Sequence, residues 1–355
     1  MPELPEVEAV RRGLEAAILR CTVADATLHR RDVVVAQGDP PGGWSRRPRT
    51  PQPPLDHPAN RSAAATSTSN PPASPRRRVT KDDLLRGAAV TDVLRKGKVI
   101  AIRADSGAAL VVRLGMTGSL LLRPAGRPLP NSDHVHITWR LTPPTQPRSP
   151  SRRSTSSPAV RTSTGGDASA SGPLRLVFRD PRRFGGVWLC PTWDHVLEHH
   201  FHRLGPDALD ITPDQLATAL APRRSPSTAA AQLRPARSIK AALLDQATIA
   251  GVGNIYADEA LFAARIGPLR PAAELTDDET SRLAHELRRI LHAAVRAGGT
   301  TIRDYLNTSG DPGGFHEHAV YGRAGLPCIR CGETLQARSV AQRTTVACHA
   351  CQRWH

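Results

Sequence analysis

Four cysteines near the C-terminus have the spacing of a metal site. Cys328 and Cys331 form one Cys-x2-Cys knuckle, and Cys348 and Cys351 form a second one sixteen residues later. Two such knuckles on a short β-hairpin supply four thiolates for one tetrahedral zinc ion and leave no position for a substrate. The zinc would therefore be structural, and it would supply folding energy that so short a segment cannot obtain from a core. Two disulfides are the alternative, but disulfides are rare in the cytoplasm.

The N-terminal sequence MPELPEVE offers an amine and three carboxylates. Met1 precedes a small residue, which is the usual context for methionine removal, so the mature chain would begin with Pro2. Its α-amino group would be a secondary amine beside the carboxylate of Glu3. Pro5 suits the first position of a helix, and Glu6 suits the positive end of the helix dipole. A helix start does not explain the residues that precede it.

Two turns between predicted strands carry large side chains. RLGMTGSL contains Met116, and FRDPRRFGG contains Arg182 and Phe184. An exposed aromatic ring beside arginines suits a wedge in a base stack, with the arginines contacting phosphates or bases. The alternative is ordinary packing, in which Met116 fills a gap in the core and Phe184 is partly buried.

Two further motifs could bind phosphate. In GVGNIYADE, glycines precede a helix that starts near Asn254, whose side chain can cap the helix or donate to phosphate. Packing between two helices is an equally good interpretation of that motif. Only four of the 48 basic residues are lysines, and two of them, Lys96 and Lys98, stand together in KGK. This placement favours a need for a compact ammonium charge at that turn.

The composition indicates a polyanionic partner. The formal net charge is +16, which is typical of nucleic-acid-binding proteins, although basic tails alone can produce it. Three segments rich in Pro, Ser, Thr, Ala and Arg are predicted to be disordered inserts, at about 40–78, 143–172 and 221–238. They carry +13 together, so the folded part must bind nucleic acid with placed side chains rather than with bulk charge.

Hydrophobic periodicity predicts an α+β fold, beginning with an amphipathic helix over residues 5–20. Strands are then predicted over Thr22–Ala36, Ala88–Arg103, Ala109–Leu122, His134–Leu141 and Leu174–Leu189. To about residue 191, the chain should therefore be one helix plus an antiparallel β-domain. Cys21 and Cys190 lie in or beside these strands and are interpreted as core residues.

From Trp193 onward the pattern is helical. Capping boxes begin at Thr212 and Thr276, and the second one opens a helix that should reach about Ala297. The chain has no run of 18 apolar residues and no signal peptide, so we expect a cytoplasmic protein.

Taken together, the motifs resemble the formamidopyrimidine-DNA glycosylase family, bacterial 8-oxoguanine repair enzymes with endonuclease VIII-like relatives. The matching stretches occur in the family's order over the whole chain: MPELPEVE, RKGKV, LGMTG, DHV, DPRRFG, GVGNIYADE, VYGRAGLPC and QRTTVAC. The initial PELPEVE favours the formamidopyrimidine branch. The resemblance implies a catalytic β-sandwich domain with an N-terminal helix over 2–191, a helix–two-turn–helix DNA-binding domain over 192–322 and a zinc finger over 323–355.

The resemblance also implies the activity, a bifunctional DNA glycosylase and AP lyase that removes oxidised purines from double-stranded DNA in base excision repair. Pro2 would attack C1′ of the flipped nucleoside, and Glu3 would donate a proton to the sugar. Glu6 would support the site, and Lys98 would contact a phosphate near the lesion. The protein would act as a monomer with one zinc ion, in the cytoplasm and on the nucleoid.

Other DNA contacts are carried over position by position. Asn254 and Arg343 match the family's phosphate clamps, and His134 and Lys240 align with further DNA-contact positions. The residues that match the trio filling the void left by the flipped base are Met116, Arg182 and Phe184. Residues 303–321 match the loop that closes over the oxidised base.

Two departures from the family pattern stand out. Arg113 occupies a position where many members have histidine; because arginine also donates to phosphate, we expect altered affinity rather than lost chemistry. The arginine-rich inserts are the second departure. The alternatives are an oxidised-pyrimidine glycosylase on the same fold and a non-catalytic zinc-containing DNA-binding protein, which would have no need of a free N-terminal proline.

Overall fold

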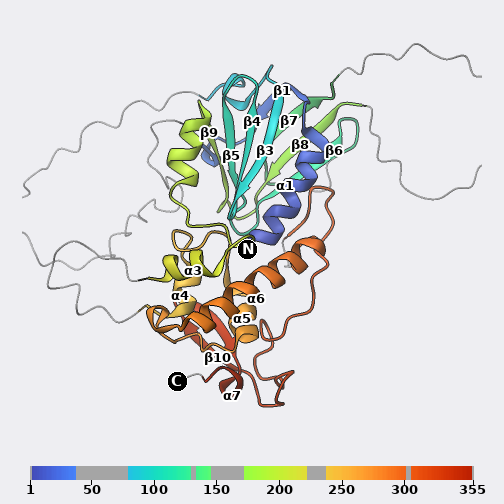
Figure 1. The fold of residues 1–355 in the computed structure, drawn as a ribbon. Coiled ribbons are helices and arrows are strands. Elements are labelled where there is room, and N and C mark those ends of the chain that lie inside the picture. The colour runs from blue at the N-terminus through green and yellow to red at the C-terminus, as the bar shows by residue number, and fades with distance from the viewer. Residues whose placement is uncertain are drawn as a thin grey trace, which may run out of the picture.

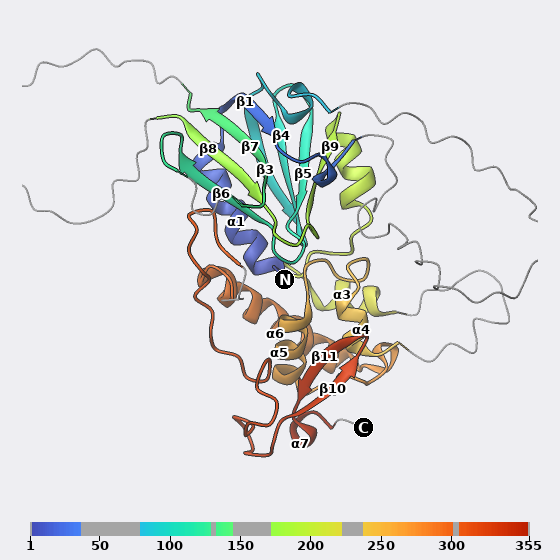
Figure 2. The ribbon, with the colours of Figure 1, turned by 180° about the vertical axis from the view of Figure 1, so that it is seen from behind.

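The computed structural model describes residues 2–36, 79–128, 133–144, 172–221, 237–300 and 305–353. Figures 1 and 2 show two lobes: a β-sandwich with helix α1 along it, and a helical lobe that ends in a β-hairpin. The α+β architecture expected from the sequence is confirmed. The three predicted inserts lie almost wholly outside the described residues, so their disorder stays a prediction.

Helix α1 (Leu4–Ile18) is the first element, and it ends two residues earlier than expected. It begins with Pro in its first turn and a capping box, in which the Glu3 amide donates to Glu6 Oε2 at 2.7 Å. Its buried apolar side chains, among them Val10 and Leu14, recur at helical spacing and pack into the core of the sandwich.

Two sheets form the sandwich. The first contains, in spatial order, β1 (Thr22–Leu28), β7 (Val135–Thr142), β8 (Leu174–Arg179) and β6 (Ser119–Pro124). The second contains β2 (Val34–Val35), β9 (Gly186–Cys190), β5 (Ala109–Arg113), β4 (Val99–Ala104) and β3 (Val90–Lys96). All neighbouring strands are antiparallel except the short β2–β9 pair. Cys21 and Cys190 are buried free cysteines, as expected.

Four of the expected long strands are each two strands in the structure. The segment 88–103 folds into the β3–β4 hairpin, because Gly97 adopts a φ of +56° that turns the chain back. Segment 109–122 divides into β5 and β6, and 174–189 into β8 and β9, with each pair split between the two sheets. Segment 22–36 divides into β1, the short helix η1 (Arg31–Val33) and β2. The three turns between β3 and β4, β5 and β6, and β8 and β9 carry Lys98, Met116, and Arg182 with Phe184, respectively.

The helical lobe is built around one long helix. After α2 (Trp193–Val196) and η3 (Leu197–Phe201) come α3 (Pro213–Leu220), α4 (Ile239–Leu244), α5 (Asn254–Ala264) and α6 (Asp277–Arg296). Both predicted capping boxes are present, at Thr212 and at Thr276. The chain then forms a hairpin of β10 (Gln336–Val340) and β11 (Arg343–Ala347), followed by α7 (His349–Gln352). Two further short 3-10 helices are η2 (Asp82–Leu84) and η5 (Ala272–Glu274).

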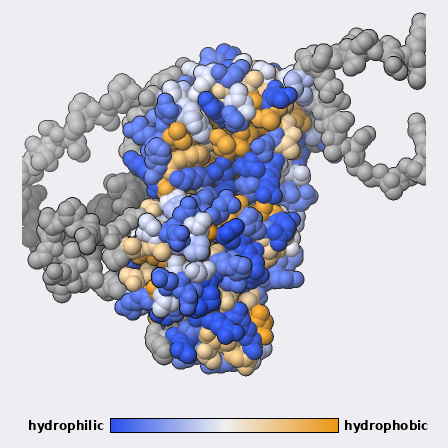
Figure 3. All heavy atoms as spheres, in the orientation of Figure 1, coloured by the Kyte–Doolittle hydropathy of each residue, from blue (hydrophilic) through white to orange (hydrophobic). Residues whose placement is uncertain are grey.

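Figure 3 shows a mostly hydrophilic face with hydrophobic residues in separate groups. Among the described helices, none is long and apolar enough to cross a bilayer.

A buried ion cluster joins the two lobes. Arg95, at the end of β3, donates to Glu8 Oε2 at 2.8 Å and to both carboxylate oxygens of Asp207, at 2.7 and 3.0 Å. The same Asp207 accepts from the amide of Gly97 at 2.7 Å. Glu8 also pairs with two arginines of its own helix. The cluster therefore fixes the β3–β4 turn against α1 and against the start of the helical lobe.

The ionisation of Glu8 should make the free energy of unfolding depend on pH in the acid range. Burial alone would raise the pKa of Glu8, but hydrogen bonds from arginines outweigh it and lower the pKa to about 2. A depressed pKa stabilises the fold above the unfolded value, near 4.3, and this contribution disappears as pH falls toward 2. Glu8→Gln should therefore lower the free energy of unfolding by about 2 kcal/mol at pH 7.

The measurement is denaturant unfolding of both proteins at pH 7 and pH 3, where the difference should have shrunk by more than half. Glu15→Gln is the matched control, since Glu15 pairs with Arg11 at the exposed side of the same helix. A difference that is equal at both pH values would contradict the assigned role.

Candidate active site and DNA-binding surface

The first residues of the chain meet the first turn of α5. Glu3 is 2% exposed, and its Oε1 accepts a hydrogen bond from the amide of Ile255 at 3.1 Å. Its Oε2 is buried and has no hydrogen-bond partner among the described residues. A Cβ at Gly253 would lie 2.2 Å from the Glu3 carboxyl carbon, so only glycine permits this approach. Pro2, immediately before Glu3, is buried at the same place.

The carboxyl group of Glu6 holds Glu3 in place through hydrogen bonds to three parts of the chain. Its Oε1 accepts from the Tyr256 hydroxyl at 2.8 Å and from the Thr300 amide at 2.7 Å, while Oε2 accepts from the Glu3 amide. Burial raises the pKa of Glu6, and the charge of Glu3 raises it further, against these hydrogen bonds. Tyr256 and Thr300 also hydrogen-bond each other, at 2.9 Å. The carboxyl group thus connects α1 to α5 and to the segment that follows α6.

Lys98 approaches the same carboxylates from the β3–β4 turn. Gly97 allows the turn to pack closely, since a Cβ there would lie 2.9 Å from that of Ala250. Burial lowers the pKa of Lys98, and the charges of Glu3 and Glu6 oppose that shift. Two separate segments, residues 2–6 and the β3–β4 turn, therefore bring the amine of Lys98, two carboxyl groups and Pro2 into one site beside the first turn of α5.

The predicted wedge residues lie on two adjoining turns. Phe184 is 56% exposed, and the guanidinium of Arg182 lies over its ring, 5.1 Å from the centroid. Met116 is half-buried on the β5–β6 turn. The turns touch through backbone, because a Cβ at Gly115 would lie 2.4 Å from the amide nitrogen of Gly185. Phe184 is thus more exposed than a core residue would be, and its role as a wedge in DNA stays a prediction.

Two of the predicted phosphate-binding residues are held next to each other. Asn254 Nδ2 donates to the carbonyl of Thr344 at 2.9 Å, which joins the first turn of α5 to β11. Arg343, one residue earlier on that strand, is exposed, and its charge adds to burial in lowering the pKa of Lys98. On the sandwich, His134 is exposed, with a left-handed φ of +66°.

Arg113, which departs from the family pattern, is exposed at the end of β5. Its guanidinium lies 5.0 Å from the ring centroid of Trp188 on the neighbouring strand. The site thus keeps a cation at this position, and the stacking contact limits where the cation can point.

Lys240 requires a correction, because its side chain is fully buried and cannot reach DNA. Its Nζ donates to Asp258 Oδ1 and to the hydroxyl of Thr345, both at 2.6 Å. Asp258 Oδ2 accepts from the amide of Val346. Matching a family position had suggested a contact, whereas the ammonium group actually ties α4 and α5 to β11.

The loop expected to cover the base is only partly described, since residues 301–304 lie outside the described ranges. The rest is anchored at both ends. The Tyr305 hydroxyl donates to the carbonyl oxygens of Glu6 and Gly298, and Glu259 accepts from the amides of residues 319, 320 and 321. Sequence reasoning missed Tyr256 and Glu259 as site-building residues, although both lie in the GVGNIYADE motif.

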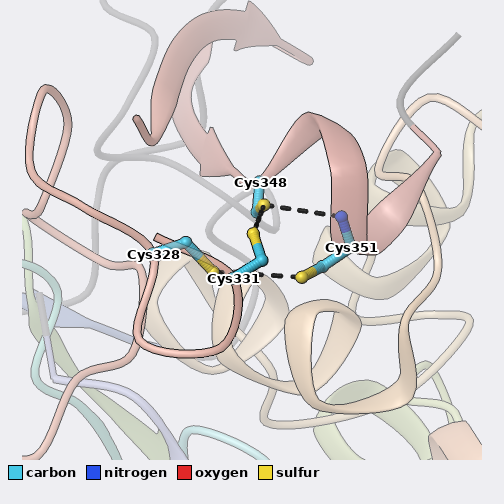
Figure 4. A group of neighbouring side chains, drawn as sticks. All are labelled: Cys328, Cys331, Cys348 and Cys351. Carbon is cyan, nitrogen blue, oxygen red and sulfur yellow. Dashed lines mark hydrogen bonds between the residues drawn. The ribbon is translucent and has the colours of Figure 1, made fainter. Parts of the chain in front are cut away.

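The four C-terminal cysteines converge as their spacing predicted. Figure 4 shows the two knuckles facing each other, and their sulfur atoms all lie within 4.8 Å of one another. All four are free thiols, so the disulfide alternative is wrong for this structure. The amides of Arg330 and Cys351 donate to the sulfurs of Cys328 and Cys348, at 3.4 Å each. Amide donors of this kind stabilise thiolates, so the cluster fits a metal ion.

Comparisons with known proteins agree with this geometry. Residues 1–45 and 59–187 match the family model "Formamidopyrimidine-DNA glycosylase N-terminal domain", and residues 210–305 match "Formamidopyrimidine-DNA glycosylase H2TH domain". The formamidopyrimidine-DNA glycosylase of Xanthomonas oryzae pv. oryzae is 33% identical over 99% of this chain and 100% of its own. That of Moorella thermoacetica is 34% identical over 95% of this chain and 94% of its own.

Solved structures are similar over the same length. The MutM (Fpg) protein of Thermus thermophilus is 31% identical, with a TM-score of 0.66 and complete coverage of both chains. The wild-type Lactococcus lactis Fpg, in complex with DNA containing N7-benzyl-Fapy-dG, is 25% identical, with a TM-score of 0.68 and coverage of 99% and 100%.

The buried Lys240–Asp258 pair generates a stability prediction. Removing one partner leaves an uncompensated buried charge, which typically costs about 3–5 kcal/mol. Lys240→Met should therefore lower the melting temperature by roughly 6 °C or more. The double variant Lys240→Met/Asp258→Leu should recover much of that loss in differential scanning calorimetry. A double variant less stable than the single one would show that the pair itself, rather than the orphaned charge, decides stability.

Proposed function

The chain belongs to the formamidopyrimidine-DNA glycosylase family, and from this premise we propose how its own residues perform the reaction. The protein is a bifunctional DNA glycosylase and AP lyase that excises oxidised purines. Full-length relatives carry the formamidopyrimidine name, which favours purine lesions over the oxidised-pyrimidine alternative. Membership of an enzyme family argues against a merely DNA-binding protein. The observation that supports the residue assignments best is the buried Pro2–Glu3 pair at the first turn of α5.

Pro2 is the nucleophile once Met1 has been removed. A free α-amine has a pKa near 8, well below that of a lysine, so a usable fraction is neutral at pH 7. Its lone pair attacks C1′ of the flipped nucleoside, and the bond from C1′ to the base breaks, with its electrons leaving on the base. Opening of the sugar ring gives an iminium. That cation acidifies the C2′ proton, so the strand breaks by β-elimination and then δ-elimination.

Glu3 handles the protons of these steps. Only one of its carboxylate oxygens is occupied by an amide, so Oε2 remains available to the sugar. Held in this way, Glu3 donates a proton to the sugar ring during attack and then shuttles protons during elimination. Glu6 positions Glu3 through the Glu3 amide and does not need to touch substrate. Lys98 places a positive charge beside both and contacts a phosphate near the lesion.

DNA is held and distorted by residues outside the catalytic centre. Asn254, Arg343 and His134 contact phosphates, which fixes the register of the duplex without reading sequence. The side chains that fill the space left by the flipped nucleotide are Met116, Arg182 and Phe184. Phe184 enters the base stack, and Arg182 faces the unpaired base. Double-stranded DNA with oxidised bases or abasic sites is therefore the partner.

The four cysteines hold one structural zinc ion. Zinc bound by Cys328, Cys331, Cys348 and Cys351 supplies folding energy to the C-terminal hairpin. The hairpin in turn presents Arg343 beside Asn254. We divide the chain accordingly into a catalytic domain (2–191), a helix–two-turn–helix domain (192–322) and a zinc finger (323–355), acting as a cytoplasmic monomer.

Blocking the N-terminus tests the nucleophile. One extra residue between Met1 and Pro2 converts the secondary amine into an amide, which has no nucleophilic lone pair. Borohydride trapping on a duplex with 8-oxoguanine opposite cytosine should then fall at least roughly 100-fold. The same residue added after His355 is the control and should trap like the wild type. Undiminished trapping by the blocked protein, together with its loss in Lys98→Arg, would move the nucleophile to Lys98.

Removal of one zinc ligand tests the metal. Cys348→Ser should lower the zinc content from one ion per chain and weaken DNA binding by about tenfold, because Arg343 loses its support. The far-UV circular dichroism spectrum of the protein should change little, because the sandwich lobe stays folded. Cys190→Ser is the control, since Cys190 is a buried cysteine of the sandwich outside the cluster. Elemental analysis that finds no metal in freshly purified, reduced wild-type protein would refute the site.

A further inference from the structure

Asp180 lies completely buried at the end of β8, where three turns meet. Its carboxylate accepts two hydrogen bonds, Oδ1 from the Thr117 hydroxyl at 2.5 Å and Oδ2 from the Gly185 amide at 2.7 Å. Its backbone amide donates to the carbonyl of His134 at 3.2 Å, and its carbonyl oxygen lies 2.8 Å from Nε2 of His136. One residue therefore contacts the β5–β6 turn, the β8–β9 turn and the start of β7.

Thr117 relays this anchor to the wedge. Its hydroxyl donates to Asp180 and accepts from the amide of Arg182 at 3.1 Å. Thr117 is itself buried and directly follows Met116. A single hydroxyl group thus fixes the backbone of Met116 on one turn and of Arg182 on the other.

The glycines of the two turns keep them in contact. A Cβ at Gly185 would lie 2.6 Å from the carbonyl oxygen of Arg113, and one at Gly115 would lie 2.4 Å from the carbonyl carbon of Phe184. The turns therefore pack backbone against backbone, and their relative position depends on the few hydrogen bonds between them. Of the apolar side chains on these turns, Leu114 is buried in the sandwich core, whereas Phe184 is 56% exposed.

We propose that Asp180 and Thr117 form a positioning pair that holds Met116, Arg182 and Phe184 as one rigid unit, so that the three side chains enter the duplex together when the damaged nucleotide leaves it. The inference rests on the proposed function of those three residues. Neither Asp180 nor Thr117 touches DNA.

Rigidity matters here because extrusion of a base is a costly equilibrium. Unstacking and unpairing cost a few kcal/mol, and inserted side chains return part of this only if they are already in place. Loosened turns would lose conformational entropy on insertion and so would shift the equilibrium back to the stacked base. Steps after the base has gone depend much less on this equilibrium, because an abasic site has no base to unstack.

Thr117→Val tests the pair, since valine keeps the shape of threonine but lacks the hydroxyl. Single-turnover release of 8-oxoguanine opposite cytosine should slow by about tenfold. Cleavage of a duplex with a preformed abasic site should stay within about threefold of wild type. Thr117→Ser, which keeps the hydroxyl, should restore base release to within about twofold. Asp180→Asn, which replaces one acceptor by a donor, should resemble Thr117→Val or be more severe.

A second readout does not need catalysis. The protein is bound to a duplex with a tetrahydrofuran abasic analogue opposite 2-aminopurine, whose fluorescence rises when Phe184 and Arg182 disturb its stacking. Thr117→Val should lose more than half of that rise, and Thr117→Ser should keep it. A wild type inactive on 8-oxoguanine would refute the proposed substrate, while this measurement would still decide the positioning role.

Three results would overturn the inference. The first is an equal loss on the 8-oxoguanine and abasic duplexes in Thr117→Val, which indicates general damage to the fold. The second is a wild-type fluorescence rise in Thr117→Val. The third is a failure of Thr117→Ser to rescue either readout.

Discussion

The hydrogen bond from the Ile255 amide to Glu3 joins the third residue of the chain to a helix about 250 residues later. The proposed catalytic centre depends on it. An N-terminus is normally the most mobile part of a domain, yet a nucleophile must be held within a fraction of an ångström. Here the positive end of α5 receives the carboxylate of Glu3, and Gly253 leaves it the necessary room. The first residues of the chain are therefore held between the two lobes by hydrogen bonds, as an internal segment would be.

Glu6 also joins distant parts of the chain through a single carboxyl group. One carboxyl group accepts from Glu3, Tyr256 and Thr300, which come from three distant parts of the chain. Removing these donors would leave a buried carboxyl group without partners, which is expensive in a low-dielectric interior. The cluster of Glu8, Arg95 and Asp207 does a parallel task for the turn that carries Lys98. Each lobe has its own apolar core, and these polar interactions join the lobes together with the apolar contact that Leu4 of α1 makes in the core of the helical lobe.

Much of this could be predicted from the sequence, and the failures have physical reasons. Local signals succeeded: the capping boxes, the cysteine spacing and the glycine-rich turns each depend on residues close together in the chain. Long strands were predicted where the structure has pairs, because apolar periodicity continues across a turn of only a few residues. Lys240 was misassigned because a motif gives a position but not its exposure, and its partner Asp258 lies on another helix. The roles of Tyr256 and Thr300 depend on contacts across about 250 to 290 residues, which no local pattern contains.

Because Glu3 and Glu6 depend on the amides of Ile255 and Thr300, their positions can be fixed only late in the synthesis of the chain. A nascent chain exposes its proline as soon as the initiator methionine is removed, long before the second half has been translated. At that stage the amine has no positioned acid beside it, because the amides of α5 and of residue 300 have not yet emerged. Under the roles proposed for Pro2 and Glu3, we therefore expect chains that terminate early, or lose their C-terminal half to proteolysis, to be unable to cleave DNA. On this proposal, strand cleavage is expected only from a molecule that has been synthesised and folded at least as far as Thr300.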